Sequence, residues 1–252
     1  GKFNNACANC MAKRSKKGGG GSKQKPQHSQ ASSSKKKREK KGAGSKSKQE
    51  SPQDGKRVTF VLEFPSMENM ASCLARVSAF LEDPKHHGEV SKPSQVSQLV
   101  SSRYAGHNFS LESFKKALSA IGDLTKEEAK VKQAISAAVR RGGRGSEAYY
   151  IIAHVRKDEK TLQHEKWHAT YHFDDEYRSR VSGVWGMVKK GSPAWAEQFE
   201  KHLSDKYASH VWVDEFQAIV LNREYECATK IVNLLQSILP KKEPFETVAV
   251  SL

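Results

Sequence analysis

The chain has 252 residues, a mean hydropathy of −0.72 and 43 Lys and Arg residues against 28 Asp and Glu residues. It contains no apolar stretch of 18 residues and no hydrophobic leader, which argues against a membrane-spanning or secreted protein. We therefore expect an intracellular protein, nuclear or cytoplasmic, although a first residue other than Met leaves a removed targeting segment open.

The positive charge is concentrated at the N-terminus. Residues 1–57 carry 17 basic and three acidic side chains, a net charge of +14, whereas residues 58–252 carry a net charge of only +1. Because Gly, Ser and Lys dominate residues 1–57, this segment has too little apolar surface to offset the entropy of ordering. It is predicted to be a disordered basic tail, followed by a single folded domain at 58–252.

The most basic part of the tail is typical of a nuclear localisation signal or a nucleic-acid tether, since clustered cations displace counterions from phosphates. A merely solubilising tail is the alternative. Cys7 and Cys10 have the spacing of half a zinc knuckle, but no second pair follows them. The basic cluster consists of Lys35, Lys36, Lys37, Arg38, Lys40 and Lys41.

The first half of the folded region is predicted to be one strand followed by three helices. Residues 57–64 are β-branched and aromatic and end at Pro65, which predicts a strand. Apolar residues at helical spacing predict helices at 67–81, 111–121 and 126–140, behind N-cap residues Ser66, Ser110 and Thr125. Residues 85–94 are predicted to be a polar loop, and the Gly- and Arg-rich stretch 140–145 a flexible connector.

The second half is predicted to be one buried strand followed by helices. The strand covers 148–155, and a turn at 156–158 leads to a helix at 160–172. Further helices are predicted at 176–188, 194–207, 213–222 and 224–239. The fold class is therefore α+β and predominantly helical, with a small sheet.

One motif in the 160–172 helix indicates chemistry. His164, Glu165 and His168 form the pattern H-E-x-x-H, which is expected about 0.03 times by chance in a chain of this composition. On a helix the two histidines share one face, where both imidazoles can reach one zinc ion while Glu165 lies between them. The alternative is an exposed or partly buried stripe of polar residues, His164, His168 and His172, without a metal.

The strand followed by this helix resembles the zincin metallopeptidases over about residues 148–222. The resemblance implies a zinc cofactor held by His164 and His168, a peptide or protein substrate, and Glu165 as the general base. Two residues depart from the family's pattern, because Lys166 is charged and Trp167 is unusually bulky for their positions in such helices.

Zinc requires a third protein ligand. His172 is excluded on an unbroken helix, because it lies eight residues, or about 12 Å, from His164. The segment 213–218 resembles the acidic helix that supplies a glutamate ligand in the gluzincin branch, which makes Glu215 the expected third ligand. Its competitors are Glu197, Glu200 and Glu224, which have the pattern of solvent-facing helix carboxylates.

The remaining candidates have supporting roles. In zincins a Tyr or His stabilises the oxyanion that develops in the reaction, and Tyr171, Tyr207 and His210 are the candidates here. Asp214 is a candidate for accepting the second N–H of a ligand histidine.

Two functions from different classes remain open. The first is a zinc-dependent hydrolase, most simply a metallopeptidase. The alternative is a non-enzymatic, nucleic-acid-associated protein that uses its basic tail and retains a structural or vestigial metal site. The sequence specifies neither the substrate nor the oligomeric state.

Overall fold

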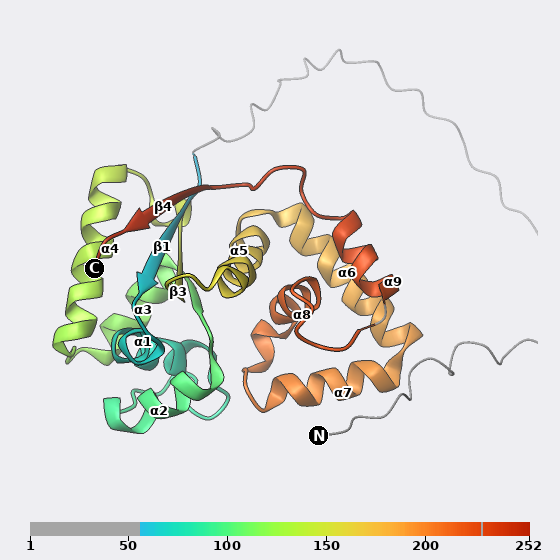
Figure 1. Cartoon of the computed structure of the whole chain (residues 1–252), viewed down its shortest axis with the longest axis horizontal. Coiled ribbons are helices and arrows are strands. Elements are labelled where there is room, and N and C mark those ends of the chain that lie inside the picture. Colours follow the sequence, from blue (N-terminus) through green and yellow to red (C-terminus); the bar gives the residue numbers. More distant parts are fainter. Residues whose placement is uncertain (1–55, 228) are drawn as a thin grey trace, which may run out of the picture. The chain divides into compact units, whose positions relative to one another are not determined.

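The computed structural model describes residues 56–227 and 229–252, which form a mostly helical α+β fold with a four-stranded mixed sheet (Figure 1). This confirms the predicted fold class. Lys35–Lys41 and the rest of residues 1–55 lie outside the described residues, so the disordered basic tail and its boundary with the folded domain stay predictions. Among the described residues, no helix is both long and apolar enough to cross a membrane.

The sheet has the strand order β2-β3-β1-β4. Strands β1 (Val58–Phe64), β3 (Tyr149–Val155) and β4 (Glu246–Val250) run parallel, whereas β2 (His107–Ser110) pairs antiparallel with β3. The two central strands, β1 and β3, are almost continuously buried because helices cover both of their faces. This double burial explains why their sequences do not alternate between apolar and polar residues.

Three helices cover one face of the sheet: α1 (Met67–Glu82), α3 (Leu111–Ile121) and α4 (Lys126–Gly142). Each begins at the predicted N-cap, since the side chains of Ser66, Ser110 and Thr125 accept hydrogen bonds from the first turns. The short helix α2 (Pro93–Arg103) packs on α1. Together they bury the main hydrophobic core of the sheet.

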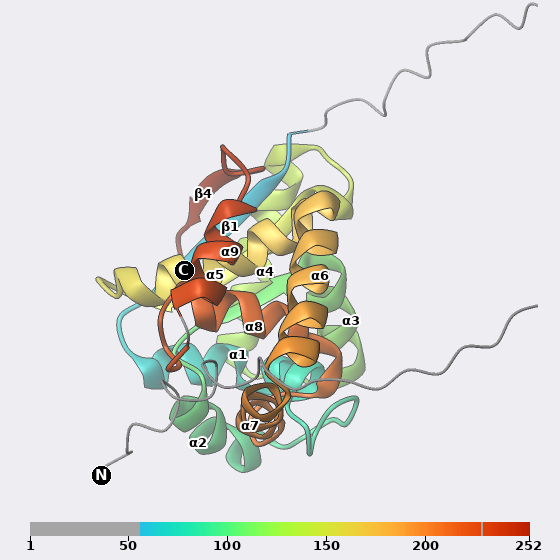
Figure 2. The same cartoon turned by 90° about the vertical axis from the view of Figure 1, so that its right-hand side faces the viewer.

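Helix α5 (Glu159–Phe173) covers the opposite face and separates the sheet from four further helices. These helices have a hydrophobic core of their own, in which Trp185, Phe199 and Phe216 are in ring contact. Figures 1 and 2 show α6 and α8 beside α5. The four helices are α6 (Asp175–Gly191), α7 (Pro193–Ser204), α8 (Trp212–Leu221) and α9 (Thr229–Ser237).

The sequence missed three elements and misplaced several boundaries. The helix predicted at 194–207 ends at Ser204, and α4 continues to Gly142, inside the predicted connector 140–145. Helix α2 begins inside the predicted loop 85–94, and strands β2 and β4 were not predicted. The last helix was predicted from residue 224 but begins at Thr229, which leaves Glu224 in the turn after α8. These segments are short, so their own periodicity is weak and the contacts they make determine their structure.

Candidate metal centre

The helix that carries the motif starts from a tight turn at the end of β3. Lys157 adopts a left-handed conformation with φ of 67°, and Asp158 then caps α5 by accepting hydrogen bonds from both the backbone and the hydroxyl of Thr161. His164 and His168 follow one turn apart and are both buried. The cap therefore fixes where α5 begins and thus which of its side chains face α8.

His164, His168 and Glu215 form a buried group that could hold a metal ion. The two histidine Nε2 atoms lie 3.1 Å apart, and the Glu215 carboxylate oxygens lie 3.9 Å from His164 Nε2 and 3.6 Å from His168 Nε2. Ligands about 2.1 Å from a tetrahedral zinc ion are separated by roughly 3.4 Å. The two Glu215 distances involve different oxygens, and one donor atom from each residue lies within 4.8 Å of the other two. The three donors therefore converge on one point and would move closer together around a bound zinc ion.

A carboxylate lies against the far nitrogen of each histidine. Glu224 Oε1 is 3.1 Å from His164 Nδ1, and Asp214 Oδ1 is 2.8 Å from His168 Nδ1, although that second contact lacks hydrogen-bond alignment. Carboxylates in these positions favour the tautomer with the proton on Nδ1. Both Nε2 lone pairs are then free to point toward Glu215.

The charge balance of the group also fits a cation. Burial raises the pKa of Glu215 to about 7, against the opposing influence of His168 and His164. Burial alone would lower the pKa of His168, but Asp214 and Glu215 raise it well above its usual value. Glu215 Oε2 is buried and has no hydrogen-bond partner. A buried acceptor without a donor costs about 1–3 kcal/mol, which a bound cation would remove.

Glu165 points to the sheet side of the histidine pair and is held there by β2. Asn108 Nδ2 donates to Glu165 Oε2 at 3.0 Å, and the Tyr150 hydroxyl donates to Asn108 Oδ1 at 2.5 Å. Burial raises the pKa of Glu165, while the neighbouring histidines act to lower it. The carboxylate is therefore fixed in position and retains some affinity for a proton, as a general base requires.

Gly106, just before β2, leaves the space that the Glu165 carboxylate occupies. A Cβ atom at this position would lie 2.4 Å from Glu165 Oε1, 2.6 Å from Thr161 Cγ2 and 2.9 Å from the Ala153 carbonyl oxygen. These separations are too short for any packed pair of atoms, so a side chain here must displace the carboxylate.

We expect the Gly106→Ala variant to keep its metal affinity and to lose roughly 10²-fold in any activity that depends on Glu165, since a displacement of about 1 Å costs that much. Activity and metal titration of the same preparation measure both. Gly183→Ala is the matched control, because nothing lies within 4 Å of its added methyl group. Equal activity in the two variants would contradict the assigned position of Glu165.

Glu224 was interpreted from sequence as a solvent-facing helix carboxylate; it is exposed, as expected, but it does not lie on a helix. It lies in the turn after α8, where Asn222 Nδ2 donates to its Oε1 at 2.6 Å and also to the Lys160 carbonyl at 3.1 Å. Arg223 makes the turn by adopting a left-handed conformation with φ of 54°. This geometry directs Glu224 back toward His164.

Replacing Glu224 with Gln should lower metal affinity about tenfold, because a neutral amide supports the imidazole less well than a carboxylate. Competition with a chelator of known affinity measures the change. Glu226→Gln, two residues further along the chain at an exposed position, is the control and should bind metal like the unchanged chain. A loss no greater than that of the control would mean that Glu224 does not support the site.

The other sequence candidates lie outside the metal group. The His172 ring stacks on Tyr150 with centroids 4.6 Å apart, and Glu200 pairs with Lys189 while Glu197 is exposed. Tyr171 lies beneath the Arg178 guanidinium, 5.9 Å from it.

The last two oxyanion candidates differ in their surroundings. His210 contacts the His87 ring. Burial, and then the carboxylates of Glu215 and Glu82, raise the pKa of Tyr207 well above its usual value. Of the three oxyanion candidates, Tyr207 is the one whose pKa is raised by the charge of Glu215.

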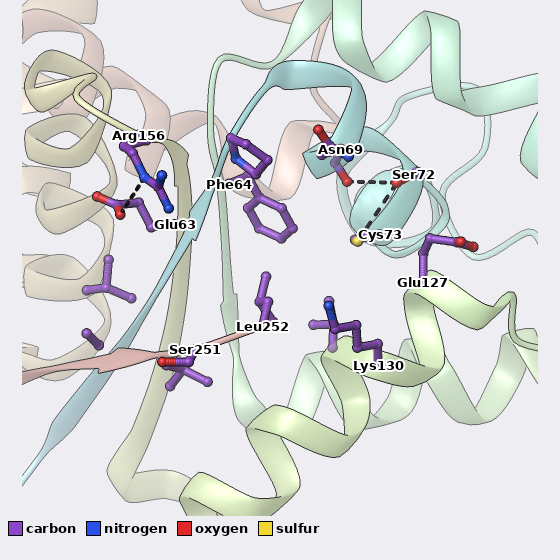
Figure 3. A pocket seen from close by; sticks show the side chains of 15 residues that line it. Glu63, Phe64, Asn69, Ser72, Cys73, Glu127, Lys130, Arg156, Ser251 and Leu252 are labelled. Atoms are coloured by element: carbon purple, nitrogen blue, oxygen red, sulfur yellow. Dashed lines mark hydrogen bonds and ion pairs between the residues drawn. The ribbon is translucent and has the colours of Figure 1, made fainter.

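A cavity of about 560 Å³ lies elsewhere, at the carboxyl ends of β1 and β4 (Figure 3). Phe64, Cys73 and Lys130 are among its lining residues, which come from β1, α1, α4, the end of β4 and the segments that follow β3 and β4. None of the lining residues belongs to the metal group. The cavity therefore contributes nothing to the chemistry of that group.

Comparisons with protein-family models, with curated proteins and with solved structures found no significant match to this chain. The capacity to bind a metal therefore rests on the chain's own geometry. That geometry comprises three donor residues at ligand spacing, with a carboxylate beside each histidine.

Proposed function

We propose that the chain is a zinc-dependent hydrolase that cleaves peptides. The observation that carries this proposal is the convergence of His164 Nε2, His168 Nε2 and the Glu215 carboxylate, while each histidine presents its Nδ1 to another carboxylate. Two imidazoles and one carboxylate are the ligand set of a catalytic zinc site that keeps a fourth position open. The resemblance of residues 148–222 to zincin metallopeptidases favours a peptide as the substrate.

Zinc bound here would supply Lewis-acid chemistry, polarising a carbonyl group and making a water molecule easier to deprotonate at neutral pH. The chain's own residues would do the rest. Glu165 accepts the proton of the attacking water, because its carboxylate is adjacent to the histidines and has a raised pKa. Asn108 keeps that carboxylate oriented throughout, since it holds Oε2 at 3.0 Å.

Tyr207 is the proposed donor to the carbonyl oxygen as negative charge develops on it. The charge of Glu215 acts on its hydroxyl, which supports a place for Tyr207 near the metal group. Burial, and then Glu215, keep this hydroxyl protonated by raising its pKa, as a hydrogen-bond donor requires.

The test is zinc titration of the metal-free full chain, combined with digestion of a defined peptide mixture analysed by mass spectrometry. We expect about one zinc ion per chain and cleavage that appears with zinc and disappears with a chelator. Failure to bind zinc would refute the metal site. Binding without cleavage of any peptide would refute peptide hydrolysis and favour a structural metal site.

A further inference from the structure

Strand β4 has an open hydrogen-bonding edge. It is the last strand in the sheet order, and Glu246 N donates to the carbonyl of Arg57, the residue just before β1, at 2.8 Å. Hydrogen-bonding direction alternates along a strand, so Glu246, Val248 and Val250 direct their N–H and C=O groups toward β1. Thr247 and Ala249 must therefore direct theirs away from the sheet.

This outer edge is also uncovered. The first four residues of β4 are exposed, and no hydrogen-bond partner is found within the described residues for the main-chain groups of Thr247 and Ala249. Val248 is 41% exposed although it is in register with the buried Phe60. An exposed edge strand with an apolar side chain is a ready site for pairing with another strand.

We propose that β4 pairs antiparallel with β4 of a second copy of this chain, about a two-fold axis at Val248. Among the antiparallel registers, this is the one that places all five residues of the strand opposite one another. Thr247 then faces the partner's Ala249, and Ala249 faces the partner's Thr247, with two hydrogen bonds in each of these pairs. All outward main-chain groups of Thr247 and Ala249 are satisfied.

The side chains are complementary in the same register. Val248 faces the partner's Val248 in a non-hydrogen-bonded pair, where Cα atoms approach to about 4.5 Å and side chains are in contact. Glu246 faces the partner's Val250 and keeps its own ion pair with Lys56 at 3.0 Å. No like charges are opposed along the strand, and the exposed apolar side chain of each copy becomes covered.

The two-fold arrangement uses the β4 edge of both copies, so the assembly closes as a dimer and does not extend into a filament. Its sheet continues from one copy into the other. A strand of five residues forms a small interface, and we therefore expect dimerisation to depend on protein concentration.

Sedimentation velocity of the full chain, from micromolar concentrations to about 1 mM, tests the association. The unchanged chain should shift from monomer to dimer with increasing concentration, and Val248→Lys should weaken dimerisation at least about tenfold, since like charges would then face each other. Met187→Lys on α6 is the matched control, because Met187 is 55% exposed but distant from the sheet edge in sequence. A chain that stays monomeric throughout would overturn the proposal, as would equal losses in both variants.

Cysteine scanning under mild oxidation tests the register. The Val248→Cys variant should form a disulfide-linked dimer, because directly opposed Cα atoms lie within the 4.4–6.8 Å or so that a disulfide spans. Thr247→Cys and Ala249→Cys should not, since each is displaced two residues from its own symmetry mate. Mass spectrometry of non-reduced digests distinguishes these bonds from those of the native cysteines. Linkage at 247 or 249 in place of 248 would overturn this register.

Hydrogen exchange of the Thr247 and Ala249 amides distinguishes the proposed dimer from an arrangement in which another part of the same chain covers the edge of β4. In the dimer, their protection should rise with protein concentration. Strong protection that is independent of concentration would mean that another part of the same chain covers β4, and would overturn the proposal.

Discussion

The Glu165→Gln variant is expected to bind zinc as tightly as the unchanged chain and to hydrolyse peptides about 10³-fold more slowly. The amide has nearly the same size as the carboxylate and can still accept the hydrogen bond from Asn108 at Oε2. It cannot accept a proton from water. Since Glu165 is not one of the three donor residues, the metal group itself is unchanged.

The comparison requires zinc content and the peptide cleavage rate from the same preparation. Glu159→Gln is the control, since it removes a carboxylate from the first turn of the same helix, away from the buried group. If the Glu165→Gln variant kept its activity, the base would have to be another carboxylate, and Glu82 would be the first to test. Burial and then Glu215 raise the pKa of Glu82 well above its usual value.

The elements that the sequence predicted well are those with strong local signals. Capping residues with regular apolar spacing placed α1, α3 and α4, and two continuous apolar runs placed β1 and β3. Strands β2 and β4 lack such signals, because His107–Ser110 is short and partly polar and β4 is mostly exposed. They are strands because β1 and β3 offer them hydrogen-bonding edges.

In the metal group, too, the residues with a local sequence signal were predicted and those that depend on tertiary contacts were not. The two histidines and Glu165 could be found because one helix places them at fixed spacing, whereas the choice of Glu215 depended on family resemblance. The structure brings His164, His168 and Glu215 together. Asn108 was missed, and Glu224 was considered only as a competing ligand and not as the partner of His164 Nδ1. These residues lie 57 and 60 residues from their partners, in segments whose position depends on tertiary packing.

Gly106 was missed for a related reason. Its backbone does not have a positive φ angle that would favour glycine. A side chain is excluded at this position because it would collide with the Glu165 carboxylate, which α5 places beside it. A single sequence offers no local signal for such a requirement, since glycines in loops are common.

His168 and His172 lie one turn apart on α5 and provide a matched pair for testing the ligand assignment. The binding free energy of a zinc site with a full ligand set is about 10–16 kcal/mol. His168→Ala removes one of the three protein donors and thus about a third of that free energy, so zinc affinity should fall by roughly three orders of magnitude. His172→Ala should change affinity less than about threefold, because its ring stacks on Tyr150 and lies outside the group.

Chelator competition measures both affinities, and circular dichroism establishes that each variant is folded. Substitution with cobalt adds a second readout, since tetrahedral coordination gives strong visible absorption that the His168→Ala variant should lose and the His172→Ala variant should keep. Equal losses in the two variants would place the metal elsewhere on α5. A loss confined to His168 would tie the ion to the point where His164 Nε2 and His168 Nε2 lie 3.1 Å apart and where both approach the Glu215 carboxylate.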